Sequence, residues 1–185
     1  MVKLLGISGS LRRASYNSGL LRAATRLMPD DATLEVASIR GIPLYDGDVE
    51  TQGIPAAVSE LKEAVVAAAG VLLVTPEYNN SIPGVFKNAI DWLSRPNTDV
   101  RRVFRGRPFA VIGASPGGFG TNLSQAAWLP VLRTLGTQFW SGGRLQVARA
   151  GSVFDEAGNL KDAGVEEQLK QFLAGYVAFV RHAVA

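Results

Sequence analysis

Residues Val71-Leu72-Leu73-Val74-Thr75 form a short run that is apolar up to its last residue and rich in β-branched side chains. Strands that face water on one side alternate polar and apolar residues. A run without this alternation is typical of a parallel strand that is covered by helices on both faces. Residues 2–7 and 109–114 form similar runs. The sequence therefore predicts a parallel sheet that contains these three segments.

Segments with helical spacing alternate with the predicted strands. Further strands are expected at 33–39 and, interrupted at two glycines, at 137–148. The expected helices, whose apolar residues recur at helical intervals, cover 20–28, 54–68, 85–93, 122–135 and 169–180. This alternation contains no internal linker. It predicts an α/β fold with an open parallel sheet, in a single domain over residues 1–185.

Capping and turn residues support two local predictions. Asn17 or Ser18 is expected to cap the first helix, and Pro29 is expected to end it. Residues 40–53 are expected to form a loop, because they hold three glycines and a proline.

The composition excludes several classes of protein. Of the 185 residues, 47% are hydrophobic and 19% are charged, which is typical of a globular chain rather than a disordered one. The absence of cysteine excludes disulfides, iron–sulfur ligation and a thiol nucleophile. The amino-terminal segment lacks the pattern of a signal peptide, and no apolar stretch is long enough to span a membrane. We therefore expect a cytoplasmic protein.

The net charge of +3 is mild, and the only dense basic cluster consists of five arginines between residues 95 and 107. Proteins that bind nucleic acid usually carry a clustered basic stripe, so we expect a solvated loop here and no nucleic-acid partner. If this loop lies beside a cofactor site, it would instead attract anionic substrates.

The segment from Gly9 to Ser18 joins the first predicted strand to the first predicted helix. Backbone N–H groups at a helix N-terminus lack intrahelical partners, and the helix dipole favours an anion there. Four side-chain donors and two arginines add to this pattern: Ser10, Ser15, Asn17, Ser18, Arg12 and Arg13. The segment therefore indicates either a phosphate site or ordinary capping of the helix, and by itself it favours neither.

Established phosphate and nucleophile motifs do not match this loop. It lacks the Gly-Lys-Ser/Thr of a P-loop and the third glycine of the dinucleotide fingerprint, and Ser10 stands where a nucleophile elbow needs glycine. His182, the only histidine, is expected in the last helical turn and not in a catalytic triad. No group of His, Asp and Glu has the spacing of metal ligands, so no metal site is expected.

Two further loops follow the other two apolar runs. Because ligands of open parallel sheets bind at the carboxyl ends of the strands, we expect all three loops to gather there. The second loop brings a carboxylate, an aromatic ring and an amide in Glu77, Tyr78 and Asn79, and Tyr78 either shields a ligand or caps the core. The glycines that follow Ser115 in the third loop indicate either a close approach to a ligand or a flexible turn.

Three motifs carry a resemblance to a known family: Gly9-Ser10-x-Arg12-x-x-Ser15-x-Asn17, Pro76-Glu77-Tyr78-Asn79 and Pro83-Gly84-x-x-Lys87-Asn88-Ala89-Ile90-Asp91-Trp92. Together, and over essentially the whole chain, they resemble the flavodoxin-like NADPH-dependent FMN reductase family, which includes bacterial quinone and chromate reductases. The resemblance implies a flavodoxin-like open sheet of five parallel strands in the order 2-1-3-4-5, with helices on both faces. The residues expected to hold the following helix, rather than to touch a ligand, are Lys87, Asn88, Asp91 and Trp92.

The resemblance also implies that FMN is the cofactor. The residues that would surround its phosphate are Ser10, Arg12, Ser15, Asn17 and Ser18. The residues that would line the isoalloxazine ring are Pro76, Glu77, Tyr78 and Asn79, and those on its other side are Ser115, Gly117 and Gly118.

We hypothesise that NADPH or NADH passes hydride to flavin N5 and is then replaced by an oxidised acceptor, which is a quinone or, as the family implies, chromate. The flavin carries this chemistry, so no catalytic acid–base pair is expected in the chain. Arg101 and Arg102 are candidates for attracting the phosphates of the nicotinamide cofactor or an anionic acceptor. The alternatives are an FMN reductase that supplies reduced flavin to a monooxygenase, a flavodoxin-type electron carrier and a non-catalytic phosphate-binding module.

The family forms dimers and often tetramers, so the resemblance implies a homodimer or homotetramer. Trp128, Phe139 and Trp140 would contribute to such an interface or belong to the core. The sequence leaves open the preference between NADH and NADPH, the physiological acceptor, and whether reduction proceeds by one or two electrons.

Overall fold

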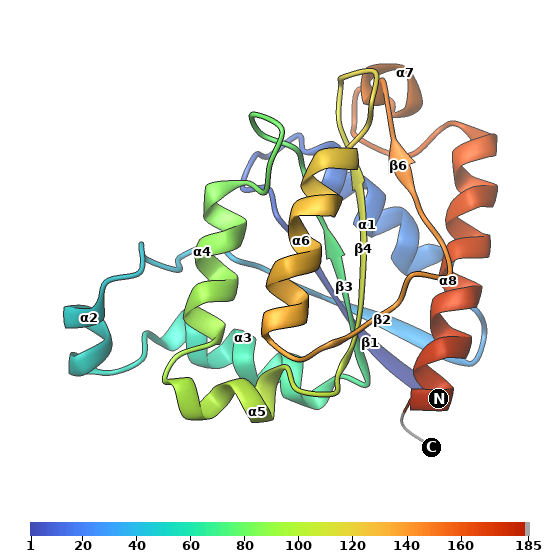
Figure 1. Cartoon of the computed structure of the whole chain (residues 1–185). Coiled ribbons are helices and arrows are strands. Elements are labelled where there is room, and N and C mark those ends of the chain that lie inside the picture. The colour runs from blue at the N-terminus through green and yellow to red at the C-terminus, as the bar shows by residue number, and fades with distance from the viewer. Residues whose placement is uncertain (184–185) are drawn as a thin grey trace.

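A parallel sheet forms the middle layer of the molecule, and helices cover both of its faces (Figure 1). The computed structural model describes residues 1–183. Neighbouring strands are parallel and follow the order β2-β1-β3-β4-β5, and β6 also pairs with β4. The predicted flavodoxin-like fold and strand order are confirmed. The strands are β1 Val2–Ser8, β2 Ala32–Ala37, β3 Gly70–Val74, β4 Pro108–Ala114, β5 Gln138–Phe139 and β6 Gln146–Val147.

The longer helices divide between the two faces of the sheet. α1 and α8 pack on one face, against side chains such as Leu4 and Leu72, while α3, α4 and α6 pack on the other, against Leu5 and Leu73. The helices are α1 Tyr16–Arg26, α2 Gly47–Gln52, α3 Ala56–Ala67, α4 Gly84–Leu93, α5 Val100–Val103, α6 Asn122–Thr134, α7 Ala150–Val153 and α8 Ala163–Ala183, with a 3₁₀ turn η1 at Asn97–Asp99.

β3 shows why a continuous apolar run predicts a covered parallel strand. All of its residues are buried. Leu72 and Val74 belong to the core beneath α1 and α8, while Val71 and Leu73 belong to the core beneath α3, α4 and α6. Successive side chains of a strand point to opposite faces, so a strand with helices on both sides needs an apolar residue at every position.

The first helix begins earlier than the sequence predicts. Ser15 is its N-cap, and the Ser15 hydroxyl accepts a hydrogen bond from the backbone N–H of Ser18 at 3.3 Å. The predicted cap at Asn17 or Ser18 is therefore wrong, because both residues lie inside the first turn. The helix ends before Pro29, as expected.

The segment predicted as a loop at 40–53 contains the short helix α2. The Asp46 carboxylate caps α2 by accepting a hydrogen bond from the backbone N–H of Asp48 at 2.9 Å. None of the α2 residues is buried, so no apolar periodicity marks this helix in the sequence.

Three aromatic residues that were candidates for a subunit interface or for the core all contact the core, and Trp128 alone is fully buried. Trp128 is fully buried in the core beneath α4 and α6, and Phe139 packs against the same core. Trp140 packs edge-on against Phe172 of α8, at 4.8 Å between ring centroids, and also contacts Tyr176. The predicted interruption of the last strand is confirmed, because β5 ends before Trp140 and β6 starts at Gln146.

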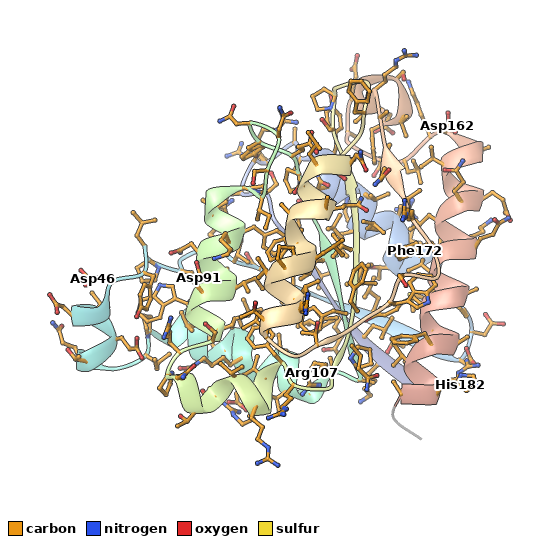
Figure 2. The ribbon with its side chains drawn as sticks, in the orientation of Figure 1. Asp46, Asp91, Arg107, Asp162, Phe172 and His182 are labelled. Atoms are coloured by element: carbon orange, nitrogen blue, oxygen red, sulfur yellow. The ribbon has the colours of Figure 1, made fainter. Side chains whose placement is uncertain are left out.

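The carboxyl-terminal helix α8 ends far from the carboxyl ends of the strands. Figure 2 shows His182 in its last turn, at the opposite end of the molecule from the loops that follow β1, β3 and β4. The His182 ring lies 2.7 Å from the Ala178 carbonyl oxygen, one helical turn back. Within residues 1–183, none of the helices combines the length and the apolar composition needed to cross a membrane.

Candidate cofactor site

Three loops that are far apart in the sequence surround one cavity of about 250 Å³ at the carboxyl ends of β1, β3 and β4. β1 lies between β2 and β3 in the sheet. The chain adds β2 on one side of β1 and then crosses to add β3 on the other side, so the cavity lies at the switch point of the sheet. The first loop and α1 contribute Ser10, Arg12, Ser15, Tyr16 and Asn17. The other two loops contribute Pro76, Glu77, Tyr78, Ala114, Ser115 and Pro116.

The N-terminus of α1 opens onto this cavity. Ser15, Tyr16 and Asn17 line the cavity and form the cap and the first residues of the helix. The N–H groups of a first helical turn lack intrahelical partners, and they carry the positive end of the helix dipole. The cavity therefore presents a ready-made position for an anion.

Arg12 adds a positive charge at the rim of the cavity. Its guanidinium group donates a hydrogen bond to the Ala14 carbonyl oxygen at 2.8 Å and stacks over the Tyr16 ring at 5.4 Å from the centroid. These two contacts restrain the side chain while most of its five N–H donors stay available. Tyr16 is a residue of the site that sequence reasoning missed, although it stands between two predicted members.

The Asn17 side chain connects α1 to β4. Its amide group donates to the Ala114 carbonyl oxygen, and its carbonyl oxygen accepts from the Ala114 N–H, both at 2.8 Å. Asn17 is only 4% exposed. Its side chain thus positions the first loop against the third, and the second N–H of its amide group stays available for the predicted contact with a phosphate.

Four of the predicted cofactor residues do not line this cavity. The Ser18 hydroxyl lies 3.1 Å from the Ser8 hydroxyl and lines a neighbouring cavity on the other flank of the first loop. Asn79 is exposed in a turn, and Gly117 and Gly118 are exposed further along the third loop. The helix α1 begins directly after its N-cap Ser15. Successive side chains of a helix point in different directions, so the Ser15 and Ser18 hydroxyls face different cavities, which the spacing in the sequence alone does not show.

The turn after Pro76 and Glu77 displays the Tyr78 ring. Tyr78 and Ser81 exchange two backbone hydrogen bonds, at 3.1 and 3.0 Å, around a two-residue turn. Its central residues, Asn79 and Asn80, have φ angles of 49° and 61°, a region that asparagine tolerates better than most residues. Tyr78 is 49% exposed, so it does not merely cap the core.

A buried polar network holds the second loop on α6. The Glu77 carboxylate accepts a hydrogen bond from the Ser124 backbone N–H at 2.9 Å, in the first turn of α6. Beneath it, the Thr75 hydroxyl lies 2.9 Å from the Ser124 hydroxyl and accepts a hydrogen bond from the Trp128 ring at 3.1 Å. The position of Pro76–Tyr78 thus depends on the N-terminus of α6.

The Glu77→Ala variant should have a free energy of unfolding about 1 kcal/mol below that of the wild type, because the Ser124 N–H loses its acceptor and α6 loses a capping charge. Urea unfolding of the flavin-free protein measures this change. The matched control is Glu60→Ala on the exposed face of α3, which should change the free energy by less than about 0.5 kcal/mol. Equal values for the two variants would contradict the capping role of Glu77.

Arg101 and Arg102 lie at the opposite end of the strands from the cavity. They belong to α5, which precedes the amino end of β4, whereas the cavity lies at the carboxyl ends. Arg102 forms ion pairs with Glu63 at 2.7 Å and with Asp99 at 3.3 Å. The structure therefore does not bring these two arginines to the predicted cofactor site. The segment that precedes a parallel strand lies at the amino end of that strand, whereas the loop that follows the strand lies at its carboxyl end.

Asp99 joins α5 to α3 through a buried lysine. The Lys62 ammonium is 3% exposed at its side chain, lies 2.9 Å from an Asp99 carboxylate oxygen, and also donates to the Arg95 carbonyl. The hydrogen bond from Lys62 is the main cause of a lowered Asp99 pKa, and a hydrogen bond from Arg102 adds to it.

The Asp99→Asn variant should lose about 1 kcal/mol of stability at neutral pH, when the charge-assisted hydrogen bond is weakened. Asp99 has a lower pKa when folded than its ordinary 3.8, so its contribution is present above that pH and is lost as the pH falls through the folded-state pKa. Urea unfolding at neutral pH and at steps below 3.8 should therefore show the two proteins converging in acid. A difference that stays constant with pH would contradict this role of the ion pair.

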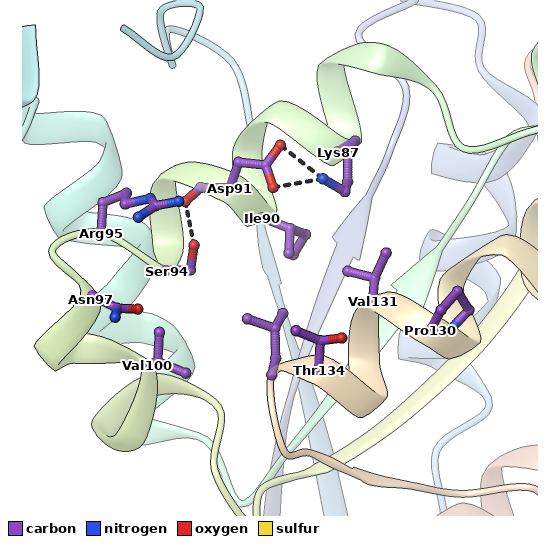
Figure 3. Close-up of a pocket in the computed structure, with 11 residues that line it drawn as sticks. Lys87, Ile90, Asp91, Ser94, Arg95, Asn97, Val100, Pro130, Val131 and Thr134 are labelled. Carbon is purple, nitrogen blue, oxygen red and sulfur yellow. Dashed lines mark hydrogen bonds and ion pairs between the residues drawn. The ribbon is translucent and has the colours of Figure 1, made fainter. Parts of the chain in front are cut away.

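A larger cavity, of about 450 Å³, lies elsewhere, between α4 and α6 (Figure 3). Lys87 and Asp91 point toward each other across its wall, and the Lys87 ammonium binds both Asp91 carboxylate oxygens, at 2.7 and 3.0 Å. On the same helix, Asn88 and Trp92 donate hydrogen bonds to the Pro43 carbonyl oxygen. Asn88 and Trp92 therefore hold α4 against the segment around Pro43, as predicted, whereas Lys87 and Asp91 pair only with each other within α4. The three loops take no part in this cavity.

The sequence matches the family model for NADPH-dependent FMN reductase over residues 2–152. It is 43% identical to an NAD(P)H-dependent FMN reductase of Pseudomonas aeruginosa, over 97% of this chain and 96% of that protein. It is 36% identical to a 2-hydroxy-1,4-benzoquinone reductase of a Burkholderia species, over 97% of each chain. Both alignments include all three loops around the cavity.

The fold is similar to that of a solved flavoenzyme, the NAD(P)H:(acceptor) oxidoreductase FerB of Paracoccus denitrificans. The two structures superpose with a TM-score of 0.88, at 31% sequence identity and with 99% of each chain covered. The motifs, the cavity at the switch point and the similarity over nearly the full length agree, and the chain belongs to the NADPH-dependent FMN reductase family.

Proposed function

We propose that this chain is an FMN-dependent NAD(P)H oxidoreductase that reduces quinones. The observation that carries this proposal is the cavity at the carboxyl ends of β1, β3 and β4, which joins a helix N-terminus to a half-exposed aromatic residue. The names of its relatives, which include FMN reductases and quinone reductases, support the same chemistry. In this proposal residues 1–185 act as one FMN-binding domain.

The residues of the cavity fit FMN. The phosphate would bind at the N-terminus of α1, where the hydroxyls of Ser10 and Ser15 and the Arg12 guanidinium add donors to the backbone N–H groups. The flat ring would lie between the second and third loops, with the Tyr78 ring at its border and with Pro76 and Pro116 as rigid apolar walls.

When bound, FMN supplies the two-electron chemistry: NAD(P)H and a proton reduce a quinone, which gives NAD(P)⁺ and the hydroquinone. The chain's own residues would hold FMN and orient the reactants. Among the residues that line the cavity, Glu77 is the sole carboxylate, and one of its oxygens is engaged by the Ser124 N–H.

An absorbance spectrum followed by an anaerobic titration with NADPH tests the proposal. The purified protein, supplied with FMN, should show flavin bands that bleach as NADPH is added and return when benzoquinone is added. A protein that binds no flavin would support a phosphate-binding module instead. Flavin bands that NADPH does not bleach would support a flavodoxin-type carrier.

A second candidate is an FMN reductase that releases reduced flavin to a monooxygenase, and the name of the Pseudomonas aeruginosa relative favours it. The two functions differ in how FMN behaves during turnover. A quinone reductase keeps FMN through gel filtration and during steady-state quinone reduction, whereas a flavin-releasing reductase loses it.

We further propose a cytoplasmic homodimer or homotetramer that also accepts chromate. The apolar residues exposed on α4 and α6, Val85 at 39% and Leu123 and Leu129 at 45% each, support a face for subunit contact. Light scattering after gel filtration measures the oligomeric state. Steady-state NADPH oxidation with chromate as the sole acceptor measures the additional activity.

A further inference from the structure

A second cavity, of about 320 Å³, lies on the other flank of the first loop, between that loop, the side of α1 and the residues that end β2 and follow it. Four arginines line it: Arg12, Arg13, Arg22 and Arg40. Serine hydroxyls supply most of the other polar groups, and no carboxylate belongs to the lining. Guanidinium and hydroxyl donors without a carboxylate are the chemistry that binds a phosphate group.

The four arginines lack acidic partners. Within residues 1–183, none of them takes part in an ion pair, although Arg102 and Arg181 elsewhere do. Like charges gathered around one hollow raise the local positive potential and increase the concentration of anions there. A bound dianion would relieve this repulsion, so the cavity favours an occupant with negative charge.

Three of the guanidinium groups are held in place by backbone carbonyl oxygens. Arg12 donates to Ala14 at 2.8 Å, Arg22 donates to Gly158 at 2.8 Å, and Arg40 donates to Leu11 at 2.7 Å. Each guanidinium has five N–H donors, so one anchored donor orients the planar group and leaves others for a ligand. Anchoring of this kind lowers the entropy cost of binding.

The second cavity is distinct from the proposed cofactor site. The N-terminus of α1 faces the cofactor cavity, whereas the second cavity meets α1 further along, at Ser18, Leu21 and Arg22. Only Ser10 and Arg12 line both. An anion in the second cavity would therefore be held by side chains rather than by the helix N-terminus.

We infer that the second cavity binds a phosphate group other than that of FMN. Two sources share this chemistry: the 2′-phosphate of NADPH and free inorganic phosphate. The first source rests on the proposed function, because it makes the site part of the reductant's binding surface and produces a preference for NADPH over NADH. The second source does not depend on any activity of the protein.

Titration calorimetry with inorganic phosphate and FMN-saturated protein tests the site directly. The wild type should bind phosphate, and the Arg22→Gln/Arg40→Gln double variant should bind it roughly tenfold or more weakly. Arg26→Gln, an exposed arginine on α1 outside the cavity, should stay within about twofold of the wild type. The inference is overturned if FMN-saturated wild type binds no phosphate, or if the double variant binds it as the wild type does.

A further variant covers the case in which the double variant fails to fold. The Arg13 side chain makes no hydrogen bond or ion pair in the described chain, so Arg13→Gln should leave the melting temperature unchanged and still weaken phosphate binding. Unchanged phosphate affinity in a folded Arg13→Gln protein would count against the site.

Michaelis constants distinguish the two sources. If the site holds the 2′-phosphate, the double variant should raise the KM for NADPH roughly tenfold and leave the KM for NADH and kcat within about twofold. If it holds free phosphate, both KM values should stay unchanged while phosphate binding is lost. A wild type that oxidises neither reductant would refute the proposed function, and the phosphate titration would still decide on the site.

Discussion

The Asn17→Ala variant should lose about 2–4 kcal/mol of stability and bind FMN far more weakly than the wild type. Asn17 satisfies both the N–H and the carbonyl oxygen of Ala114 in a buried setting, and alanine would leave both groups without a partner. The same change releases the first loop from the third, so the cavity would lose its alignment. Urea unfolding measures the first effect, and flavin fluorescence quenching measures the second.

The Asn17→Asp variant provides a sharper control, because its effect depends on pH. One carboxylate oxygen can still accept from the Ala114 N–H, but the other would face the Ala114 carbonyl oxygen, which favours the protonated acid. The folded-state pKa of this carboxyl should therefore lie above its unfolded value of about 3.9. Stability relative to the wild type should be greatest below that value and fall as the pH rises through the folded-state pKa. A deficit independent of pH would contradict the two-way hydrogen bond.

The Gly113→Ala variant should be destabilised by about 3 kcal/mol or more and should lose roughly tenfold or more in FMN affinity. A Cβ at this position of β4 would overlap the Thr75 carbonyl oxygen and the Thr121 side chain. The backbone at Thr75, directly after β3, cannot yield as a flexible side chain would, so the chain would separate from β4 where the second and third loops begin. Thermal melting and FMN titration check the two effects.

Gly118→Ala is the matched control for this experiment. No atom lies within 4 Å of the position that a Gly118 Cβ would take, so the folded chain should tolerate the change. Gly118 is also a residue that the sequence predicts beside the flavin, although it does not line the cavity. An unchanged melting temperature and FMN affinity would agree with the structure, whereas a large loss of affinity alone would restore the sequence-based prediction.

The sheet was predictable because burial on both faces leaves a direct record in the sequence. β1, β3 and β4 carry continuous apolar runs, since each must pack against helices on two sides. The sequences of α2 and α5 show no such apolar pattern, because neither helix packs through a broad apolar face. These two short helices are held by caps and ion pairs, which a single sequence does not distinguish from the polar residues of a loop.

The site was predictable in its loops and in most of the side chains that line it, but not in which residues of each loop reach the cavity. All three loops meet at one cavity, as expected because ligands of open parallel sheets bind at the carboxyl ends of the strands. Within the first loop, Ser10, Arg12 and Ser15 reach that cavity and Ser18 does not. Ala114 and Pro116 belong to the lining although no side-chain chemistry marks them, because a cavity wall is made of whatever residues the backbone brings near.

The sequence by itself determined the layers and the end of the strands where a ligand binds, because these depend on patterns that repeat along the chain, and the family resemblance of its three motifs added the strand order. The tertiary structure alone decided that Asn17 clamps α1 to β4, that Arg101 and Arg102 lie at the opposite end of the strands, and that the arginines near the first loop surround a second hollow. These features depend on the directions of single side chains and on contacts between residues far apart in sequence. Such directions follow from three-dimensional packing and leave no periodic trace.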